Sequence, residues 1–182
     1  IIKVLYELVP YAKKLYCVKI PEKAEVVVTI AKKPTDIDLY QSQKALDNAK
    51  YAVKENGVII LVSKCRDGIG PRKFYDLLSS CRSPKEALEK VNKEWKLGYQ
   101  KVAKIAELLA MANVYAVTGL GPEVIQKVFM KPYSDLQAAI NDAINETNNG
   151  KVLFLMNGAL TCLLYTSPSP RDLSTSRMPS SA

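Results

Sequence analysis

Gln41 and Lys44 are polar residues at helical spacing whose side chains suit the binding of an organic acid. They lie three positions apart, so on a helix they are surface neighbours, about 60° apart around its axis. The lysine supplies a cationic donor and the glutamine both a donor and an acceptor, which suits a carboxylate and an adjacent hydroxyl. Taken alone, this spacing is explained better by an ordinary solvated helix edge, and a substrate site remains the second interpretation.

A second segment that could do chemistry runs from Cys65 to Gly70, directly after an apolar run. Gly68 and Gly70 at the end of a strand can bring backbone N–H groups to an anion. A dinucleotide-binding fingerprint needs a third glycine where Lys73 stands, so a tight turn is the favoured interpretation. Because the chain has no histidine to activate Cys65, we expect a buried, unreactive thiol there.

The absence of histidine also excludes a Ser-His-Asp triad and a His-based zinc site among these residues. Of the four cysteines, Cys162 lies in the C-terminal segment that differs from the rest of the chain. The other three, Cys17, Cys65 and Cys81, are widely spaced and form no C-x-x-C pair. An odd number of such cysteines predicts reduced thiols in a cytoplasmic protein.

The composition predicts a globular protein, because 48% of the 182 residues are hydrophobic and 24% are charged. No apolar run approaches the roughly 20 residues of a membrane-spanning helix, so we expect no membrane partner. The net charge of +8 would suit nucleic acid, but the lysines are spread along helix faces without a recognition motif. A solvated surface is therefore favoured over a nucleic-acid partner.

Strand and helix patterns alternate along most of the chain. Four apolar runs predict strands, at residues 26–30, 58–62, 114–117 and 152–156, and we expect the first two to be buried. A first helix is predicted from the apolar positions Ala45 to Val53, and Asn56-Gly57 should end it. A second should begin at the capping box Ser83–Glu86 and continue through Trp95 and past Gly98. A third should begin at Gly121-Pro122-Glu123, and a fourth at the box of Ser134, with its end at Gly150.

These connections predict an α/β fold, because strands separated by helices need crossover connections. We expect a three-layer, Rossmann-like arrangement, with a mainly parallel sheet of about four strands and helices on both faces. Ligands bind such sheets at the carboxyl ends of the strands. The turns after Ile30, Val62, Thr118 and Met156 are therefore the candidate places for a site.

The two ends of the chain differ from its middle. The sequence opens at Ile1 without an initiator methionine, and we expect residues 1–24 to be the end of an upstream domain or a linker. Residues 25–161 carry the α/β pattern. Residues 162–182 are rich in serine and proline, have no periodicity and resemble a translated sequencing adapter, so we expect a non-native, disordered tail and a natural protein interrupted near Thr161.

Three motifs together resemble the C-terminal domain of the nickel-dependent lactate racemase family. They are Pro34-x-Asp36-x-x-Leu39-Tyr40-Gln41-x-x-Lys44-Ala45-Leu46-x-x-Ala49, Gly57-x-Ile59-Ile60-Leu61 and Cys65-x-x-Gly68-x-Gly70. The resemblance covers roughly Tyr16 to Thr161 and includes Gly98-Tyr99-Gln100-Lys101. The chain departs from the family at Ala31-Lys32-Lys33, where glycines are common, and at Gln100, where histidine is frequent.

The resemblance implies a two-domain enzyme with its active site between the domains. The family's N-terminal domain holds a nickel-pincer nucleotide on a lysine, with histidines as a metal ligand and as acid/base groups. The implied reaction is hydride abstraction from C2 of a 2-hydroxy acid and return to the other face. Gln41 and Lys44 match the family's substrate-contacting residues, and Tyr40 lines the site. No catalytic, cofactor-binding or metal-binding residue is expected in this chain, since the acid/base histidines belong to the N-terminal domain.

Two functional hypotheses follow. The first is the C-terminal half of a nickel-pincer-nucleotide-dependent racemase or epimerase of 2-hydroxy acids, inactive by itself, whose partners are the small-molecule substrate and its own N-terminal domain. The alternative is a stand-alone α/β module that binds an anionic metabolite or a partner protein without catalysis.

Overall fold

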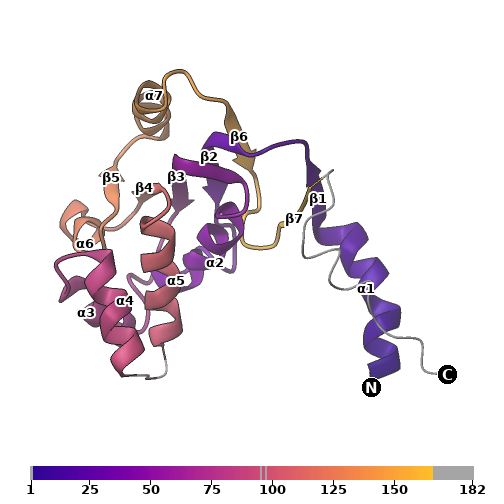
Figure 1. Ribbon diagram of the computed structural model, residues 1–182, viewed down its shortest axis with the longest axis horizontal. Coiled ribbons are helices and arrows are strands. Elements are labelled where there is room, and N and C mark those ends of the chain that lie inside the picture. The colour runs from indigo at the N-terminus through magenta and orange to yellow at the C-terminus, as the bar shows by residue number, and fades with distance from the viewer. Residues whose placement is uncertain (1, 95, 97, 166–182) are drawn as a thin grey trace. The chain divides into compact units, whose positions relative to one another are not determined.

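The computed structural model of the chain describes residues 2–94, 96 and 98–165 (Figure 1). The described chain divides into two compact units: Lys23–Thr161 forms one, and the described residues before Lys23 and after Thr161 form the other. The larger unit carries the predicted α/β pattern and all of the predicted site residues.

A parallel sheet lies at the centre of the larger unit, and among the described residues it has five strands. The strands are β2 (Ala24–Ile30), β3 (Val53–Ser63), β4 (Asn113–Thr118), β5 (Lys131–Tyr133) and β6 (Val152–Leu155), in the order β5-β4-β3-β2-β6. The predicted α/β fold is confirmed, but the expectation of about four strands misses β5. That strand has three residues and contains Pro132, so it carries no strand pattern.

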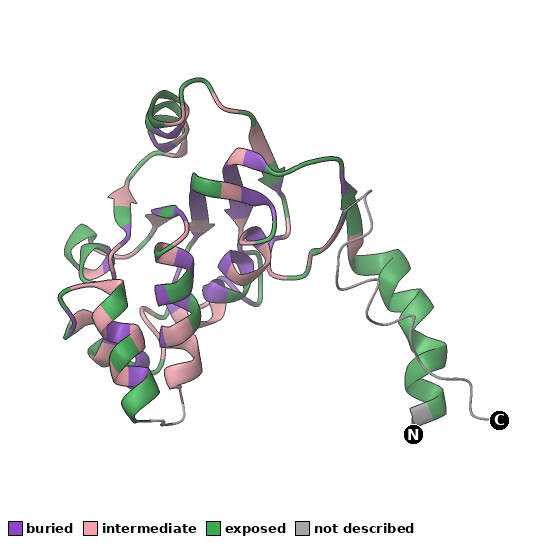
Figure 2. Cartoon of the chain, in the orientation of Figure 1, coloured by how far each residue is buried: buried purple, intermediate pink, exposed green. Residues whose placement is uncertain are grey.

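Helices cover both faces of this sheet, as predicted (Figure 1). Successive strand residues point to opposite faces, and Val26 and Val28 of β2 join Ala139 of α7 (Leu136–Glu146) in one core cluster. Thr29 belongs to the other face and donates from Oγ1 to the Ala45 carbonyl of α2 (Leu39–Ala49), at 3.2 Å. Figure 2 shows the buried strands between these two layers.

The remaining described helices of this unit lie in the connections between strands. They are α3 (Arg72–Ser79), α4 (Pro84–Lys93) and α5 (Tyr99–Leu109) between β3 and β4, and α6 (Pro122–Gln126) between β4 and β5. Among them, α5 packs against α2, α3 and α4, so it ties the long β3–β4 connection to the helix that carries Gln41 and Lys44.

The helix predicted to run through Ala52 and Val53 ends earlier, at Ala49, and β3 begins at Val53. Asn56 and Gly57 therefore do not end a helix but form an irregular start of β3, where the register against β2 shifts. Two buried apolar residues in a row fit a strand as well as a helix, so the pattern was ambiguous at this point. Gly57 is required, because a Cβ there would lie 2.5 Å from the Glu25 carbonyl oxygen.

Two other predicted helices also have different bounds. The long helix expected past Gly98 is divided into α4 and α5, and Gly98 has φ 101° just before α5. Trp95, expected on that helix, lies outside the described residues. The helix expected from the Ser134 box is capped by Asp135, which accepts from the Ala138 N–H at 2.8 Å, and it ends at Glu146 rather than at Gly150.

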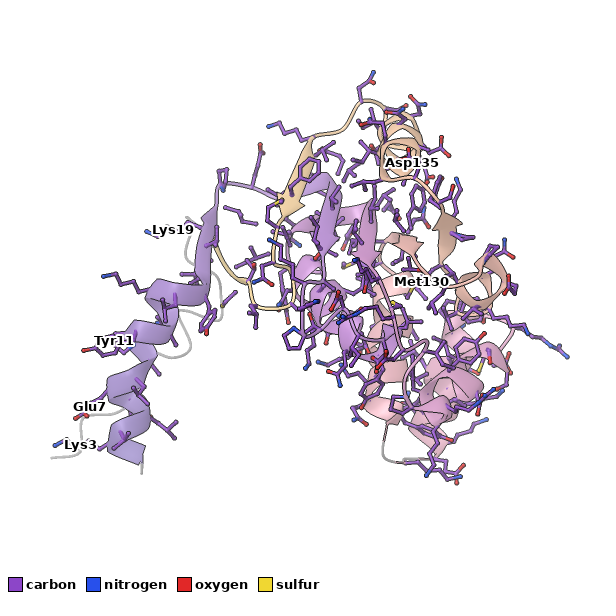
Figure 3. The ribbon with its side chains drawn as sticks, turned by 180° about the vertical axis from the view of Figure 1, so that it is seen from behind. Lys3, Glu7, Tyr11, Lys19, Met130 and Asp135 are labelled. Atoms are coloured by element: carbon purple, nitrogen blue, oxygen red, sulfur yellow. The ribbon has the colours of Figure 1, made fainter. Side chains whose placement is uncertain are left out.

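The smaller unit contains α1 (Ile2–Tyr16), β1 (Cys17–Ile20) and β7 (Cys162–Tyr165), and its two strands pair in parallel. Lys3, Glu7 and Tyr11 project outward from α1 (Figure 3). The tail expected to be disordered from Cys162 on thus begins with a strand, and its residues 166–182 lie outside the described part. No helix in the described ranges is long and apolar enough to cross a membrane.

Candidate functional site

The helix that carries the predicted site residues begins directly after the loop that follows β2. Asp38 caps α2 in an extended conformation, with φ −147°, and its Oδ1 accepts from the Gln41 N–H at 2.6 Å. Leu39, the first helical residue, is 1% exposed and anchors this end of the helix in the core. A polar cap and an apolar anchor therefore fix the backbone from which the Tyr40 and Gln41 side chains project.

The glycine turn after β3 holds the same helix end through its backbone. The N–H groups of Leu39 and Tyr40 donate to the carbonyls of Gly68 and Ile69, at 3.1 and 3.3 Å. Gly70 has φ 80°, and a Cβ there would lie 2.9 Å from the Cβ of Tyr40. The segment is thus the tight turn that the sequence favoured, and it presents the carbonyl oxygens of Gly68 and Ile69 to the start of α2.

Tyr40, Gln41 and Lys44 lie on the first two turns of α2. Tyr40 and Gln41 are half-buried and Lys44 is exposed. The Tyr40 ring meets Phe74 edge to face, with ring centroids 5.4 Å apart, and the Lys101 ammonium lies 5.1 Å from its centre. The tyrosine is thus fixed by packing, whereas the lysine is free to meet a ligand.

Lys101 of α5 is a neighbour of this site to which the sequence assigned no role. Burial lowers the pKa of its ammonium group, and the nearby positive charges of Lys104 and Lys44 lower it further. Its segment was part of the family resemblance, but only the packing of α5 on α2 shows that it reaches Tyr40.

A buried group of hydroxyls and one thiol lies between α2 and the end of β3. The Ser42 and Ser63 hydroxyls are 2.7 Å apart, and the Cys65 Sγ donates to the Ser63 Oγ at 3.4 Å. Cys65 is 3% exposed, and burial raises the pKa of its thiol. The expectation of a buried thiol is confirmed, and these contacts join α2 to the end of β3.

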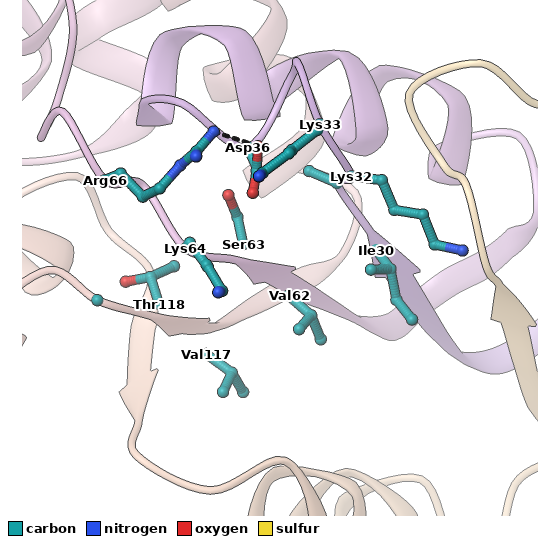
Figure 4. Close-up of a pocket in the computed structure, with 12 residues that line it drawn as sticks. Ile30, Lys32, Lys33, Asp36, Val62, Ser63, Lys64, Arg66, Val117 and Thr118 are labelled. Atoms are coloured by element: carbon teal, nitrogen blue, oxygen red, sulfur yellow. Dashed lines mark hydrogen bonds and ion pairs between the residues drawn. The ribbon is translucent and has the colours of Figure 1, made fainter.

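A cleft of about 710 Å³ opens at the carboxyl ends of β2, β3 and β4 (Figure 4). Ile30, Val62 and Val117 line it with apolar surface from the three strand ends. Its charged lining comes from the loops after β2 and β3, and consists of Lys32, Lys33, Asp36, Lys64 and Arg66. Tyr40, Gln41 and Lys44 are not among its lining residues.

The cleft has an excess of positive charge. Asp36 is 6% exposed and pairs with Arg66, with Oδ1 and Nη2 3.2 Å apart. Lys32, Lys33 and Lys64 are exposed, and no described residue forms an ion pair with any of them. The sequence placed a site in these turns but did not identify these cations.

The turn after Met156 was expected to contribute to the same edge, but it does not line the cleft. The strand order reverses between β2 and β6, where ligands commonly bind in such sheets. Here Gly158 donates its N–H to the Ile30 carbonyl at 3.0 Å, and a Cβ on it would lie 1.9 Å from the Thr29 Oγ1. The chain's own backbone therefore fills this position.

Within the described ranges, no three or more cysteine, aspartate or glutamate side chains gather in a group that could hold a metal ion. The chain also contains no histidine. The polar groups that the first two turns of α2 present are the Gln41 amide and the Lys44 ammonium.

Comparison with known proteins identifies the family. The family model described as the lactate racemase C-terminal domain matches residues 19–162. The lactate racemase of Thermoanaerobacterium thermosaccharolyticum is 32% identical over 132 residues, which is 69% of this chain and 31% of that protein. The lactate racemase of Lactiplantibacillus plantarum is 32% identical over 131 residues, with the same coverage of 69% and 31%.

The chain therefore spans about 31% of the length of the curated relatives it matches. The structure of the lactate racemase apoprotein from T. thermosaccharolyticum matches with a TM-score of 0.80 and 25% identity, over 85% of this chain and 39% of that one. A Thermotoga maritima protein shares the fold, with a TM-score of 0.62 and 10% identity over 91% of this chain and 42% of that one. The chain belongs to the family of lactate racemase C-terminal domains.

Proposed function

We propose that this chain is the C-terminal part of a cytoplasmic racemase or epimerase of 2-hydroxy acids that uses a nickel-pincer nucleotide, and that it binds the substrate. The observation that carries the proposal is the family match over residues 19–162, within which the half-buried Gln41 and the exposed Lys44 lie on the first two turns of α2. Its relatives are named lactate racemase.

The proposed roles follow from the position of each side chain. The exposed Lys44 ammonium would hold the substrate carboxylate, and its charge would stabilise negative charge that develops on the reacting oxygen. The Gln41 amide would donate to or accept from the 2-hydroxyl group. Tyr40, fixed by Phe74, would form a wall against the carbon skeleton.

The residues of this chain do not fit the nickel cofactor itself. The chain has no histidine, and its described acidic and thiol side chains form no cluster of three that could bind a metal. The proposal therefore assigns the cofactor and the acid/base groups to an N-terminal domain, and the chain described here to substrate binding and orientation.

A lysine substitution in the full-length protein tests the proposal. We expect Lys44→Ala to lower kcat/KM for racemisation of its 2-hydroxy acid about 100-fold or more, because one charged donor to a developing oxyanion is lost. The matched control is Lys85→Ala, an exposed lysine on α4, which should stay within about twofold of the parent.

Both variants should keep the thermal midpoint of the parent, since an exposed lysine adds little to stability. Near-normal turnover in Lys44→Ala would overturn the assignment of Lys44. Absence of racemase activity from the full-length parent loaded with nickel cofactor, across a panel of 2-hydroxy acids, would overturn the proposed function.

A further inference from the structure

We propose that the cleft at the carboxyl ends of β2, β3 and β4 binds the oxyanion of a small organic acid or phosphate ester. The site consists of Lys32, Lys33 and Lys64 around an apolar floor formed by Ile30, Val62 and Val117. These residues are all in this chain, so the proposal does not depend on the racemase assignment.

The first argument is charge. Four cationic side chains line the cleft against one carboxylate, and that carboxylate, Asp36, is already paired with Arg66. The three lysines have no ion-pair partner among the described residues, although elsewhere in the unit Lys50, Lys54 and Lys104 are each paired with an acidic side chain. Unpaired like charges around one concave surface repel each other, and a bound anion would relieve that repulsion.

The second argument is that the backbone of the site is already fixed. Thr35 donates both its N–H and its Oγ1 to the Lys32 carbonyl, each at 2.8 Å. The Gly119 N–H donates to the Lys64 carbonyl at 3.2 Å, and a Cβ on Gly119 would lie 2.6 Å from that oxygen. The two lysines therefore start from anchored positions, so binding would order only their side chains.

The third argument is the floor, which selects the class of ligand. Ile30, Val62 and Val117 are only half-buried at the ends of their strands, and they leave apolar surface in a cleft of about 710 Å³. A bare inorganic ion would use the lysines alone. A ligand with an apolar body could also cover the floor, as small-molecule sites with a few polar groups commonly do.

The test is a titration of the 182-residue chain with inorganic phosphate, phenyl phosphate and benzoate at constant ionic strength, followed by amide NMR shifts and calorimetry. We expect shifts confined to residues 30–33, 62–66 and 117–119, and tighter binding of the ligands with a ring than of inorganic phosphate. The stronger of phenyl phosphate and benzoate tells whether the natural ligand is a phosphate ester or a carboxylic acid.

The matched variants are Lys32→Gln/Lys33→Gln/Lys64→Gln and the control Lys85→Gln/Lys93→Gln/Lys127→Gln, which removes the same charge from exposed positions on other surfaces. A unit charge at about 4 Å in water changes binding by roughly fivefold, so the cleft variant should lose at least about tenfold in affinity. The control variant should bind like the parent, and both should keep the parent's thermal midpoint.

Equal losses in the two variants, or shifts spread over all lysine-bearing surfaces, would overturn the proposal, because binding would then follow net charge alone. Loss of binding in Lys44→Ala with full binding in the cleft variant would also overturn it and would assign the anion to α2. Since racemisation is not measured here, failure of the cleft proposal would leave the substrate-binding proposal for Gln41 and Lys44 standing.

Discussion

The two edges of the central sheet use charge in different ways. At the amino edge, Glu25 at the start of β2 accepts from the Lys54 ammonium and, at 2.9 Å, from the Lys151 N–H. At the carboxyl edge, Lys32, Lys33 and Lys64 surround a cleft without an acidic partner among the described residues. The charged side chains of the amino edge hold strands together, whereas the three lysines of the carboxyl edge remain available to a ligand.

This contrast follows from what the two edges must do. The amino edge has to hold an irregular start of β3, where four residues lie between the positions paired with Ala24 and Val26. At the carboxyl edge, the loops are already held by backbone hydrogen bonds to Lys32 and Lys64. The side chains of Lys32, Lys33 and Lys64 form no ion pair with a described residue, and such side chains on loops are commonly available for binding.

The largest effect on stability should come from adding a Cβ at Gly57, where β3 lies close to β2 at the amino edge. Gly57→Ala places a Cβ 2.5 Å from the Glu25 carbonyl oxygen and 2.8 Å from the Val53 Cγ2, so the backbone of β2 or β3 must move. We expect a loss of about 2–3 kcal/mol in the free energy of unfolding, measured by urea denaturation.

The neighbouring substitution Asn56→Gly is its control. Asn56 is exposed and has φ 59°, a conformation that glycine adopts without strain, so its stability should stay within about 0.5 kcal/mol of the parent. A Gly57→Ala protein as stable as the parent would show that the amino edge is not tightly packed.

A smaller effect on stability is expected from removing the charge of Asp36, the acidic residue of the cleft at the carboxyl edge. Asp36→Asn breaks the pair with Arg66, whose side chain is 42% exposed, so we expect a loss of only about 1 kcal/mol in the free energy of unfolding. The cleft gains net positive charge, and phenyl phosphate should bind several-fold more tightly in calorimetry. Weaker binding in a folded Asp36→Asn variant would mean that the carboxylate, and not the lysines, defines the ligand.

The smallest effect should be the pH dependence contributed by Glu25. The Lys54 ammonium, together with backbone N–H donors that include Lys151, lowers the pKa of the Glu25 carboxyl to about 2 from an ordinary 4.5. Because the folded-state pKa lies below the unfolded one, the stabilisation is fully present above about pH 4.5 and is lost as the pH falls toward 2.

Thermal midpoints measured from pH 7 to 2 check this expectation. The difference between the parent and Glu25→Gln should shrink across that window, while Glu55→Gln, at an exposed position of β3, serves as the comparison. Identical pH profiles for the two variants would contradict a special role for Glu25 at the amino edge.

Local sequence patterns predicted the strands that continuous apolar runs form. The runs at 26–30 and 114–117 are strands because continuous β-branched and apolar residues suit a sheet that is buried on both faces. The run predicted at 152–156 forms β6, which ends at Leu155 and is only partly buried. The start of β3 could not be predicted, since its irregular geometry depends on the close approach of Gly57 to Glu25. The start of α5 likewise depends on Gly98 at φ 101°, in a pattern that otherwise continues as a helix.

In the candidate site, too, the sequence selected residues that are close together in the chain and not those that strand pairing brings together. Tyr40, Gln41 and Lys44 are close in sequence, so helical spacing and a family resemblance were enough to select them. Lys32 and Lys64 are brought to one cleft only because β2 and β3 are neighbours in register, with Ile30 beside Val62. No local pattern contains that information, although the rule for parallel sheets did select the edge at which the cleft opens.

The way the glycine turn holds α2 bears on how this family can diversify. The Leu39 and Tyr40 N–H groups donate to the carbonyls of Gly68 and Ile69, and every residue type supplies such a carbonyl. Side chains in the turn can therefore drift during evolution without displacing Gln41, provided that Gly70 stays. A directed-evolution library aimed at new substrates could randomise positions 66, 67 and 69 and still inherit an intact start of the helix.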